Sequence, residues 1–190
     1  MTGDRLRSVL FVGHTGFVKA PVVVAEVFSR LAEECDELAF TWCSPASQHE
    51  EIRRRLSPRA RERTSMRGWM SQTQLRQLYD GSGIFLFPSF YEGFGKVFLE
   101  AMARGMCVVT SDTGGMRDLI SHGVDGFKVS VGDVDGFVST VRQLLQRSER
   151  SRAVSHCAAE TARRYSWDRV ARETIDFYMQ LLNSRGLRRR

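Results

Sequence analysis

The sequence predicts a Rossmann-like α/β domain of three layers, with a parallel sheet of about six strands between two layers of helices. Short apolar runs rich in β-branched and aromatic residues alternate with amphipathic segments along most of the 190 residues. Short loops rich in glycine, serine, proline and aspartate separate them. This alternation is typical of successive strand–helix–strand units, which build parallel sheets covered on both faces.

The expected strands are short and apolar, because strands inside such a sheet are buried on both faces. Five runs are clear, and a run over 64–69 is weaker. In chain order the expected strands cover 9–12, 38–42, 64–69, 84–87, 108–110 and 126–129.

The expected helices lie between these strands and carry apolar residues three and four positions apart. They cover 19–34, 48–56, 72–80, 95–104, 114–122 and 135–145. Two C-terminal helices, over 150–164 and 167–182, follow without a strand between them. We therefore expect a single domain over 1–184 and a basic tail over 185–190.

The composition excludes several classes of protein. The apolar fraction of 42% and the charged fraction of 26% are those of a globular domain. No apolar run approaches the length of about 18 residues that a transmembrane helix needs, and the polar start of the chain does not resemble a signal peptide. The four cysteines include no C-x-x-C pair, which argues against zinc and a disulfide framework. We expect a cytoplasmic protein in which Cys107 is a buried, unreactive thiol.

The net charge of +6 comes from arginines, since only three of the 28 basic residues are lysines. Seven arginines lie within 53–67 and four within 185–190. Such clusters can bind nucleic acid or an anionic membrane surface. Because no aromatic residues are interleaved with them, we expect no specific nucleic-acid binding. A solvated helix and tail is the simpler interpretation, and peripheral contact with the inner membrane face is the alternative.

Ligands of open parallel sheets bind beyond the carboxyl ends of the strands, so the loops there are the candidate site. The strongest motif is in the loop over 88–95, where Gly93, Phe94 and Gly95 lead into a helix whose free N–H groups suit a phosphate. Glu92 in the loop and Glu100 on the helix can each accept hydrogen bonds from a vicinal diol of a sugar.

A plain surface helix is the alternative interpretation for Glu100. At 100° per residue, Lys96, Glu100 and Arg104 form one polar stripe. A pair between Glu100 and Arg104 has the favourable order and contributes only about 0.2–0.5 kcal/mol.

A second motif follows the first expected strand, where Gly13 and Gly16 flank His14 and Lys19 opens a helix. A lysine fits poorly with the dipole of a helix's first turn, which favours a functional role such as meeting a diphosphate. His14 is a lesser candidate for phosphate or sugar contact.

A third motif, Gly114-Gly115, follows the fifth expected strand, and either an anion cradle or an ordinary turn explains it. The G-x-G-x-x-G and G-x-x-x-x-G-K-[ST] patterns are absent from the sequence. Their absence argues against a nicotinamide-dependent dehydrogenase and a P-loop NTPase.

Together these segments resemble the donor-binding domain of GT-B glycosyltransferases of group 1, the GT4 type. The resemblance spans nearly the whole chain. It is carried by Pro88-Ser-x-x-Glu92-Gly-Phe-Gly-(x)4-Glu100-Ala-Met-Ala-x-Gly105, Val108-Val-x-Ser, Gly114-Gly115, Gly123-x-x-Gly126 and Tyr165-Ser-Trp167-Asp.

The resemblance implies a retaining transferase that uses a nucleotide-diphosphate sugar and needs no metal. It implies that Glu92 contacts the donor sugar, Glu100 the ribose and Lys19 the leaving diphosphate. The amides near Gly93–Gly95 would lie beside the sugar and diphosphate, and the loop containing Trp69 and Met70 would form the base pocket.

Three departures from the family pattern qualify this reading. His14 stands where the family has an arginine, so Arg117 or a protonated His14 would have to supply that charge. Ala20 replaces a glycine. The chain matches only the donor half, so we expect either a truncated or split product or a partner chain that supplies the acceptor domain. The last helix would then expose Trp167, Phe177, Tyr178 and Leu181. The other function left open is a non-catalytic module that binds a nucleotide sugar or only a partner.

Overall fold

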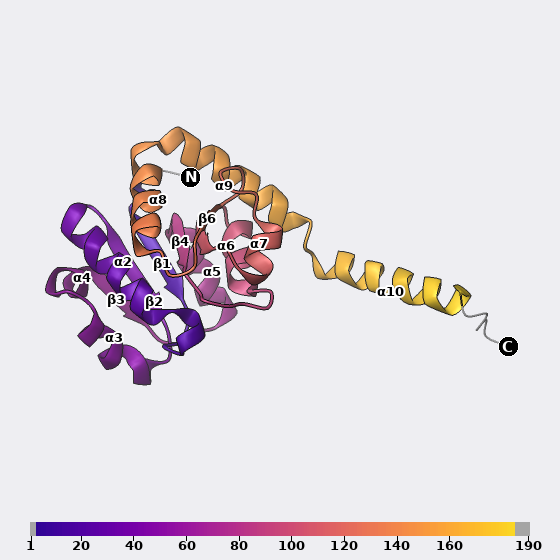
Figure 1. Cartoon of the computed structure of the whole chain (residues 1–190), viewed down its shortest axis with the longest axis horizontal. Helices are drawn as coiled ribbons and strands as arrows, with labels where there is room; N and C mark the ends of the chain where they lie inside the picture. The colour runs from indigo at the N-terminus through magenta and orange to yellow at the C-terminus, as the bar shows by residue number, and fades with distance from the viewer. Residues whose placement is uncertain (1–2, 185–190) are drawn as a thin grey trace.

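A computed structural model of the chain describes residues 3–184, which contain a six-stranded parallel sheet between two layers of helices (Figure 1). The strand order is β3-β2-β1-β4-β5-β6, and every pairing is parallel. The predicted three-layer Rossmann-like fold is therefore confirmed. The strands are β1 (Ser8–Val12), β2 (Ala39–Cys43), β3 (Thr64–Arg67), β4 (Ile84–Phe87), β5 (Cys107–Ser111) and β6 (Phe127–Val129).

The helices divide between the two faces of the sheet. On one face α2 packs against α3, α4 and α8, and on the other α6 packs against α9. The α-helices are α1 (Gly3–Leu6), α2 (Pro21–Glu34), α3 (His49–Arg55), α4 (Pro58–Arg63), α5 (Gln72–Gly81), α6 (Lys96–Ala103), α7 (Gly114–Leu119), α8 (Val134–Gln146), α9 (Ser148–Arg163) and α10 (Trp167–Ser184). Two 3₁₀ turns, Phe17–Lys19 and Ala46–Gln48, complete the set.

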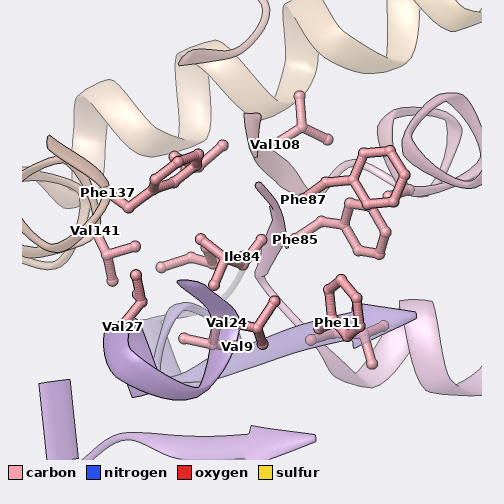
Figure 2. Close-up of a cluster of buried hydrophobic side chains, with 14 of the residues drawn as sticks. Val9, Phe11, Val24, Val27, Ile84, Phe85, Phe87, Val108, Phe137 and Val141 are labelled. Atoms are coloured by element: carbon pink, nitrogen blue, oxygen red, sulfur yellow. The ribbon is translucent and has the colours of Figure 1, made fainter. Parts of the chain in front are cut away.

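The core lies at the centre of the sheet, where apolar strands meet the apolar faces of α2 and α8. Val9 of β1 is in register with Ile84 of β4. Figure 2 shows these two side chains beside Val27 of α2 and Val141 of α8, and all four are completely buried. Burial of a side chain of this size contributes about 1.5–3 kcal/mol, so this layer holds the two central strands together.

One predicted helix start was wrong by two residues, and one helix was not predicted. The first long helix begins at Pro21 rather than Lys19, because Ala20 has a left-handed conformation (φ 50°) and proline suits the first helical position. Helix α4 was not predicted, because only Ala60 of this arginine-rich segment is buried. Its local signal is Ser57, whose hydroxyl accepts a hydrogen bond from the Ala60 N–H.

The chain changes direction between β1 and β4. After β1 it continues toward β2 and β3, and after β4 it continues toward β5 and β6, although β1 and β4 are neighbours. Loops that leave the carboxyl ends of such a pair diverge and open a crevice, which is the usual ligand site of this sheet type. The predicted motif that contains Gly13, His14 and Lys19 follows β1. The predicted motif that contains Glu92 and Gly93–Gly95 follows β4.

Helix α10 extends away from the body of the domain in Figure 1, and every residue along it is exposed. The exposure predicted for Trp167, Phe177, Tyr178 and Leu181 is confirmed, with fractions between 39% and 79%. Within residues 3–184, no helix has both the length and the apolar character that crossing a membrane requires. The basic tail expected over 185–190 lies outside the described residues.

Candidate functional site

The loops after β1 and β4 contact each other directly at the carboxyl ends of these strands. The Phe90 N–H donates to the Val18 carbonyl at 2.9 Å, and the rings of Phe17 and Phe90 lie 5.0 Å apart. These contacts link residues about 70 positions apart in the chain. They place the second predicted motif against the first.

A lysine and a glutamate from the two loops form an ion pair. The Lys19 ammonium donates to Glu92 Oε1, and the Ser89 hydroxyl donates to the same oxygen at 2.9 Å. The side chains of Lys19 and Glu92 are only 18% and 11% exposed, and Ser89 is buried. The ammonium also lies 4.9 Å from the centre of the Phe87 ring, close enough for a cation–π contact. The pair is thus held in place before any ligand arrives.

The prediction that Lys19 lies in the first turn of a helix was wrong, although its observed position supports a functional role. Lys19 ends the 3₁₀ turn Phe17–Lys19 and is not in the first turn of α2. The unfavourable dipole invoked for it is therefore absent. The positioning comes instead from Glu92 and Phe87.

The start of α6 lies beside the same phenylalanine. Gly95 has φ 77°, and a Cβ there would come within 3.0 Å of Phe98 and 3.4 Å of Phe87. No side chain caps this helix start. Its first N–H groups therefore remain available to an anion next to the Lys19–Glu92 pair.

Gly114 and Gly115 support the loop after β4 through its backbone. The Gly115 N–H donates to the Gly93 carbonyl at 3.1 Å. A Cβ at Gly114 would lie 1.8 Å from the Glu92 carbonyl oxygen, and one at Gly115 would lie 2.7 Å from the Phe94 carbonyl oxygen. These glycines permit a close approach of two loops, a role that the sequence analysis did not foresee.

Glu100 is an exposed carboxylate between two grooves. It does not pair with Arg104, contrary to the surface-helix interpretation, because Arg104 donates to both carboxylate oxygens of Asp80, with Nε at 2.7 Å from Oδ1. The Tyr79 hydroxyl donates to Glu100 Oε2 at 3.1 Å instead. A groove of about 270 Å³ lies between α5 and α6, and one of about 340 Å³ lies between α6 and the start of α10. Lys96 and Phe94 line the second groove.

The remaining predicted contacts are less central. His14 Nδ1 accepts the Gly16 N–H at 2.9 Å, a contact within its own loop. Arg117 is engaged with Asp112, to which its Nε donates at 3.3 Å. Arg117 is therefore held by Asp112 and forms no ion pair with Glu92.

Trp69 and Met70 follow the edge strand β3, on the far side of β1 and β2 from Glu92. Trp69 is 58% exposed, and Met70 packs against the core. Gln72 begins α5 two residues later and lines the groove between α5 and α6. That groove therefore extends from Glu100 toward this loop.

A larger hollow of about 470 Å³, beside Leu6 and Leu38, lies at the amino ends of β1 and β2, away from the crevice.

Much of the arginine cluster is used inside the domain. Arg63 donates to the carbonyls of Ala32 and Cys35 at the end of α2, where a cation is favourable. Arg59 pairs with Asp36, and two further arginines of α3 pair with glutamates one turn away. These contacts favour the interpretation of a solvated structural face.

The cysteines are free thiols, and two are buried as components of the core. Burial raises the pKa of Cys43 to about 11 and that of Cys107 to about 12. The prediction that Cys107 is buried is confirmed. Among residues 3–184 there is no group of three or more histidine, cysteine, aspartate or glutamate residues arranged to hold a metal ion.

Comparisons with known proteins agree on one family. A family model described as glycosyl transferases group 1 matches residues 7–147. An uncharacterised glycosyltransferase of Methanocaldococcus jannaschii is 34% identical over 63% of this chain and 31% of its own length. A D-inositol 3-phosphate glycosyltransferase of Xylanimonas cellulosilytica is 27% identical over 95% of this chain and 44% of its own.

The solved structures show the same fold at low sequence identity. Anabaena HepE in complex with UDP and glucose has a TM-score of 0.81 at 18% identity, covering 94% of this chain and 49% of its own. Sucrose-phosphate synthase from Thermosynechococcus elongatus has a TM-score of 0.81 at 20% identity, covering 97% of this chain and 47% of its own. The chain thus spans less than half the length of these relatives.

Proposed function

The chain belongs to the group 1 glycosyltransferases, and from this premise we propose that it binds a nucleotide-diphosphate sugar as the donor half of a retaining transferase of the GT4 type. The observation that carries the proposal is the Lys19–Glu92 pair beside the open start of α6. A sugar diphosphate presents hydroxyl groups and an anion next to each other. This crevice offers a carboxylate, an ammonium and free N–H groups in matching proximity.

Most of the predicted residues have a role in this proposal. Glu92 accepts hydrogen bonds from the donor sugar, while Lys19 and the amides of Gly93–Gly95 meet the diphosphate. Glu100 binds the ribose, and Trp69 and Met70 face the base. Gly114 and Gly115 keep the Glu92 loop in position. When the bond from the anomeric carbon to the diphosphate breaks, the oxygen takes the electron pair, and Lys19 with the α6 start stabilises the charge without a metal.

Transfer requires an acceptor half in addition to this donor half. The chain covers between 26% and 44% of the length of the curated glycosyltransferases it matches, which supports a role as one half of such an enzyme. We place the activity in the cytoplasm, and peripheral contact with the inner membrane face is the alternative.

A second candidate function is a non-catalytic module that binds a nucleotide sugar and regulates a partner. Two observations favour it. A histidine stands at position 14 where the resemblance implies an arginine, and Glu92 already pairs with Lys19. Transfer activity with a partner separates the two candidates, because only the catalytic half contributes to it.

The first test is a thermal-shift panel with UDP, GDP, ADP, TDP and common nucleotide sugars. Saturation at 100 times the dissociation constant stabilises the fold by about 2.7 kcal/mol, which raises Tm by roughly 5–10 °C for a chain of this size. The shift is expected with one base and is expected to disappear in Lys19→Ala and Glu100→Ala. The matched controls are Lys128→Ala on β6 and Glu26→Ala on α2, which should keep it.

Absence of a shift for every nucleotide, or equal shifts in all four variants, would contradict the proposed donor site. A transfer assay then tests the half-enzyme. We expect no transfer by the purified chain and transfer after addition of the acceptor half. Full transfer by the chain alone would overturn that part of the proposal.

A further inference from the structure

Tyr79 has a buried ring and a single polar contact near the site. It lies in the last turns of α5, is 2% exposed and packs edge-on against Phe85 with ring centres 6.0 Å apart. Its hydroxyl donates to Glu100 Oε2 at 3.1 Å. Burial first, and then the charge of Glu100, raise the pKa of Tyr79, so the hydroxyl remains protonated and donates throughout the usable pH range.

Arg104, the expected ion-pair partner of Glu100, is held elsewhere. Arg104 is one helical turn further along α6, but its side chain donates to both carboxylate oxygens of Asp80 on α5. Glu100 therefore remains unpaired with Arg104. Within residues 3–184, its Oε2 accepts from Tyr79 and no hydrogen bond to its Oε1 is present. One oxygen is thus anchored and the other is open to a ligand.

Tyr79 also distinguishes the two grooves that meet at Glu100. Tyr79 lines the groove between α5 and α6, together with Gln72 and Arg76. The groove on the other side of α6 is lined by Tyr165 and Trp167 instead. A hydrogen bond from α5 holds the carboxylate on the α5 side. It thereby selects the groove in which a ligand can meet Oε1.

We infer that Tyr79 is a positioning residue that holds the Glu100 carboxylate toward the groove between α5 and α6, where Oε1 accepts hydrogen bonds from a ribose diol. This inference rests on the proposed nucleotide binding and adds to it a residue and a subsite. Tyr79 does not touch the ligand. It acts by removing the rotational freedom of Glu100, which would otherwise have to be lost on binding.

The test compares affinities for UDP and for 2′,3′-dideoxy-UDP in the full chain, with the GDP and ADP pairs measured in parallel. Tyr79→Phe keeps the ring and removes only the hydroxyl. We expect up to about tenfold weaker binding of the ribonucleotide, the scale for immobilising one flexible side chain on binding. Binding of the dideoxy nucleotide should change less than twofold. The matched control, Tyr165→Phe, removes a hydroxyl from the other groove and should leave both affinities unchanged.

The ratio of the two affinities separates positioning from a general loss of fold, because a merely structural effect weakens both ligands equally. Each variant's Tm without ligand is recorded, and a second variant, Glu100→Gln, closes the cycle. In that background, Tyr79→Phe should lower the ratio no further.

An unchanged ratio in Tyr79→Phe, while Glu100→Ala abolishes binding, would overturn the inference and leave the proposed function standing. A reduced ratio in Tyr165→Phe alone would assign the other groove and also overturn it. If wild-type protein binds none of the nucleotides, both the proposed function and the inference fail.

Discussion

The contact between the Gly114 turn and the Glu92 loop makes a sharp prediction for Gly114→Ala. Gly114 has φ 50°, and an added Cβ would lie 1.8 Å from the carbonyl oxygen of Glu92. Since real Cβ atoms essentially never come closer than 3.0 Å, the loop must move by more than about 1 Å. The change therefore acts on the loop that carries Glu92 and not on a ligand contact of Gly114.

Two effects set the size of the loss. A side chain in the left-handed region costs about 1–2 kcal/mol, and forcing atoms into a packed contact costs about 1–3 kcal/mol. Their combined effect of about 2–5 kcal/mol lowers Tm by roughly 4–20 °C in a chain of this length. A displacement of about 1 Å at a positioned carboxylate can lower activity about 100-fold, so nucleotide-sugar binding should fall with stability.

Gly93→Ala is the matched control, because a Cβ there meets nothing within 4 Å. We expect the Tm of ligand-free Gly93→Ala to stay within about 1 °C of the wild-type value, as for other exposed substitutions. Its affinity for the nucleotide sugar should fall, since the added methyl group occupies space beside the proposed diphosphate position. Thermal unfolding without ligand and titration with the nucleotide sugar measure the two effects separately.

The reasoning fails if Gly114→Ala unfolds and binds like the wild type. It also fails if the two variants lose equal stability, because the glycines would then matter for a common reason. The first result would show that the loop yields easily. The second would show that the close approach to Glu92 is not what requires glycine at position 114.

Two further predictions concern side chains whose pKa is shifted. Burial raises the pKa of Cys43 to about 11 and that of Cys107 to about 12. Iodoacetamide at pH 8 should therefore label half-buried Cys157 first and the two buried cysteines only after unfolding. Mass spectrometry that shows Cys107 labelled as fast as Cys157 would contradict this prediction. The Arg104 hydrogen bonds lower the pKa of Asp80 below its unfolded value of about 3.9, so they stabilise the fold above that pH and the stabilisation is lost as pH falls through the folded pKa. Since the Asp80–Arg104 pair is partly exposed, Asp80→Asn should lower the free energy of unfolding in urea by at most about 1 kcal/mol at pH 7 and by less at pH 3. An equal loss at both pH values would show that this pair does not stabilise the fold through the charge of Asp80.

The strands could be predicted because buried parallel strands are continuous apolar runs with turn residues on both sides. The central strand β4 was predicted at its observed bounds, Ile84–Phe87, and all four residues are buried. The edge strand β3 was the weakest prediction, because alternate residues of Thr64–Arg67 are exposed. Helix α4 has one buried residue, so its segment has no apolar period to detect, and only its N-cap serine and the following proline indicate it.

The candidate site could be predicted where its residues form one contiguous motif and not where contacts join distant segments. Glu92 and Glu100 were predicted from their setting in a loop and the helix that follows. Tyr79 was not, because its value arises from a contact 21 positions away that nothing in the sequence announces. The alternative interpretation, a pair between Glu100 and Arg104, fails for a related reason. An i,i+4 pair is worth only about 0.2–0.5 kcal/mol. Arg104 instead donates to both carboxylate oxygens of Asp80, while Oε2 of Glu100 accepts from Tyr79.

The charges in the crevice bear on the proposal that a second half completes the enzyme. Lys19 brings one positive charge, but Glu92 cancels it at contact distance. His14 accepts a hydrogen bond at Nδ1, and Arg117 is engaged with Asp112. The start of α6 adds the equivalent of about half a charge. Lys96, exposed at the first position of α6, adds one further positive charge. In the described part of the chain, these groups together still offer a diphosphate less positive charge than it carries. Under the proposed function, the acceptor half would supply the missing cation, which gives a physical reason for transfer to require both halves.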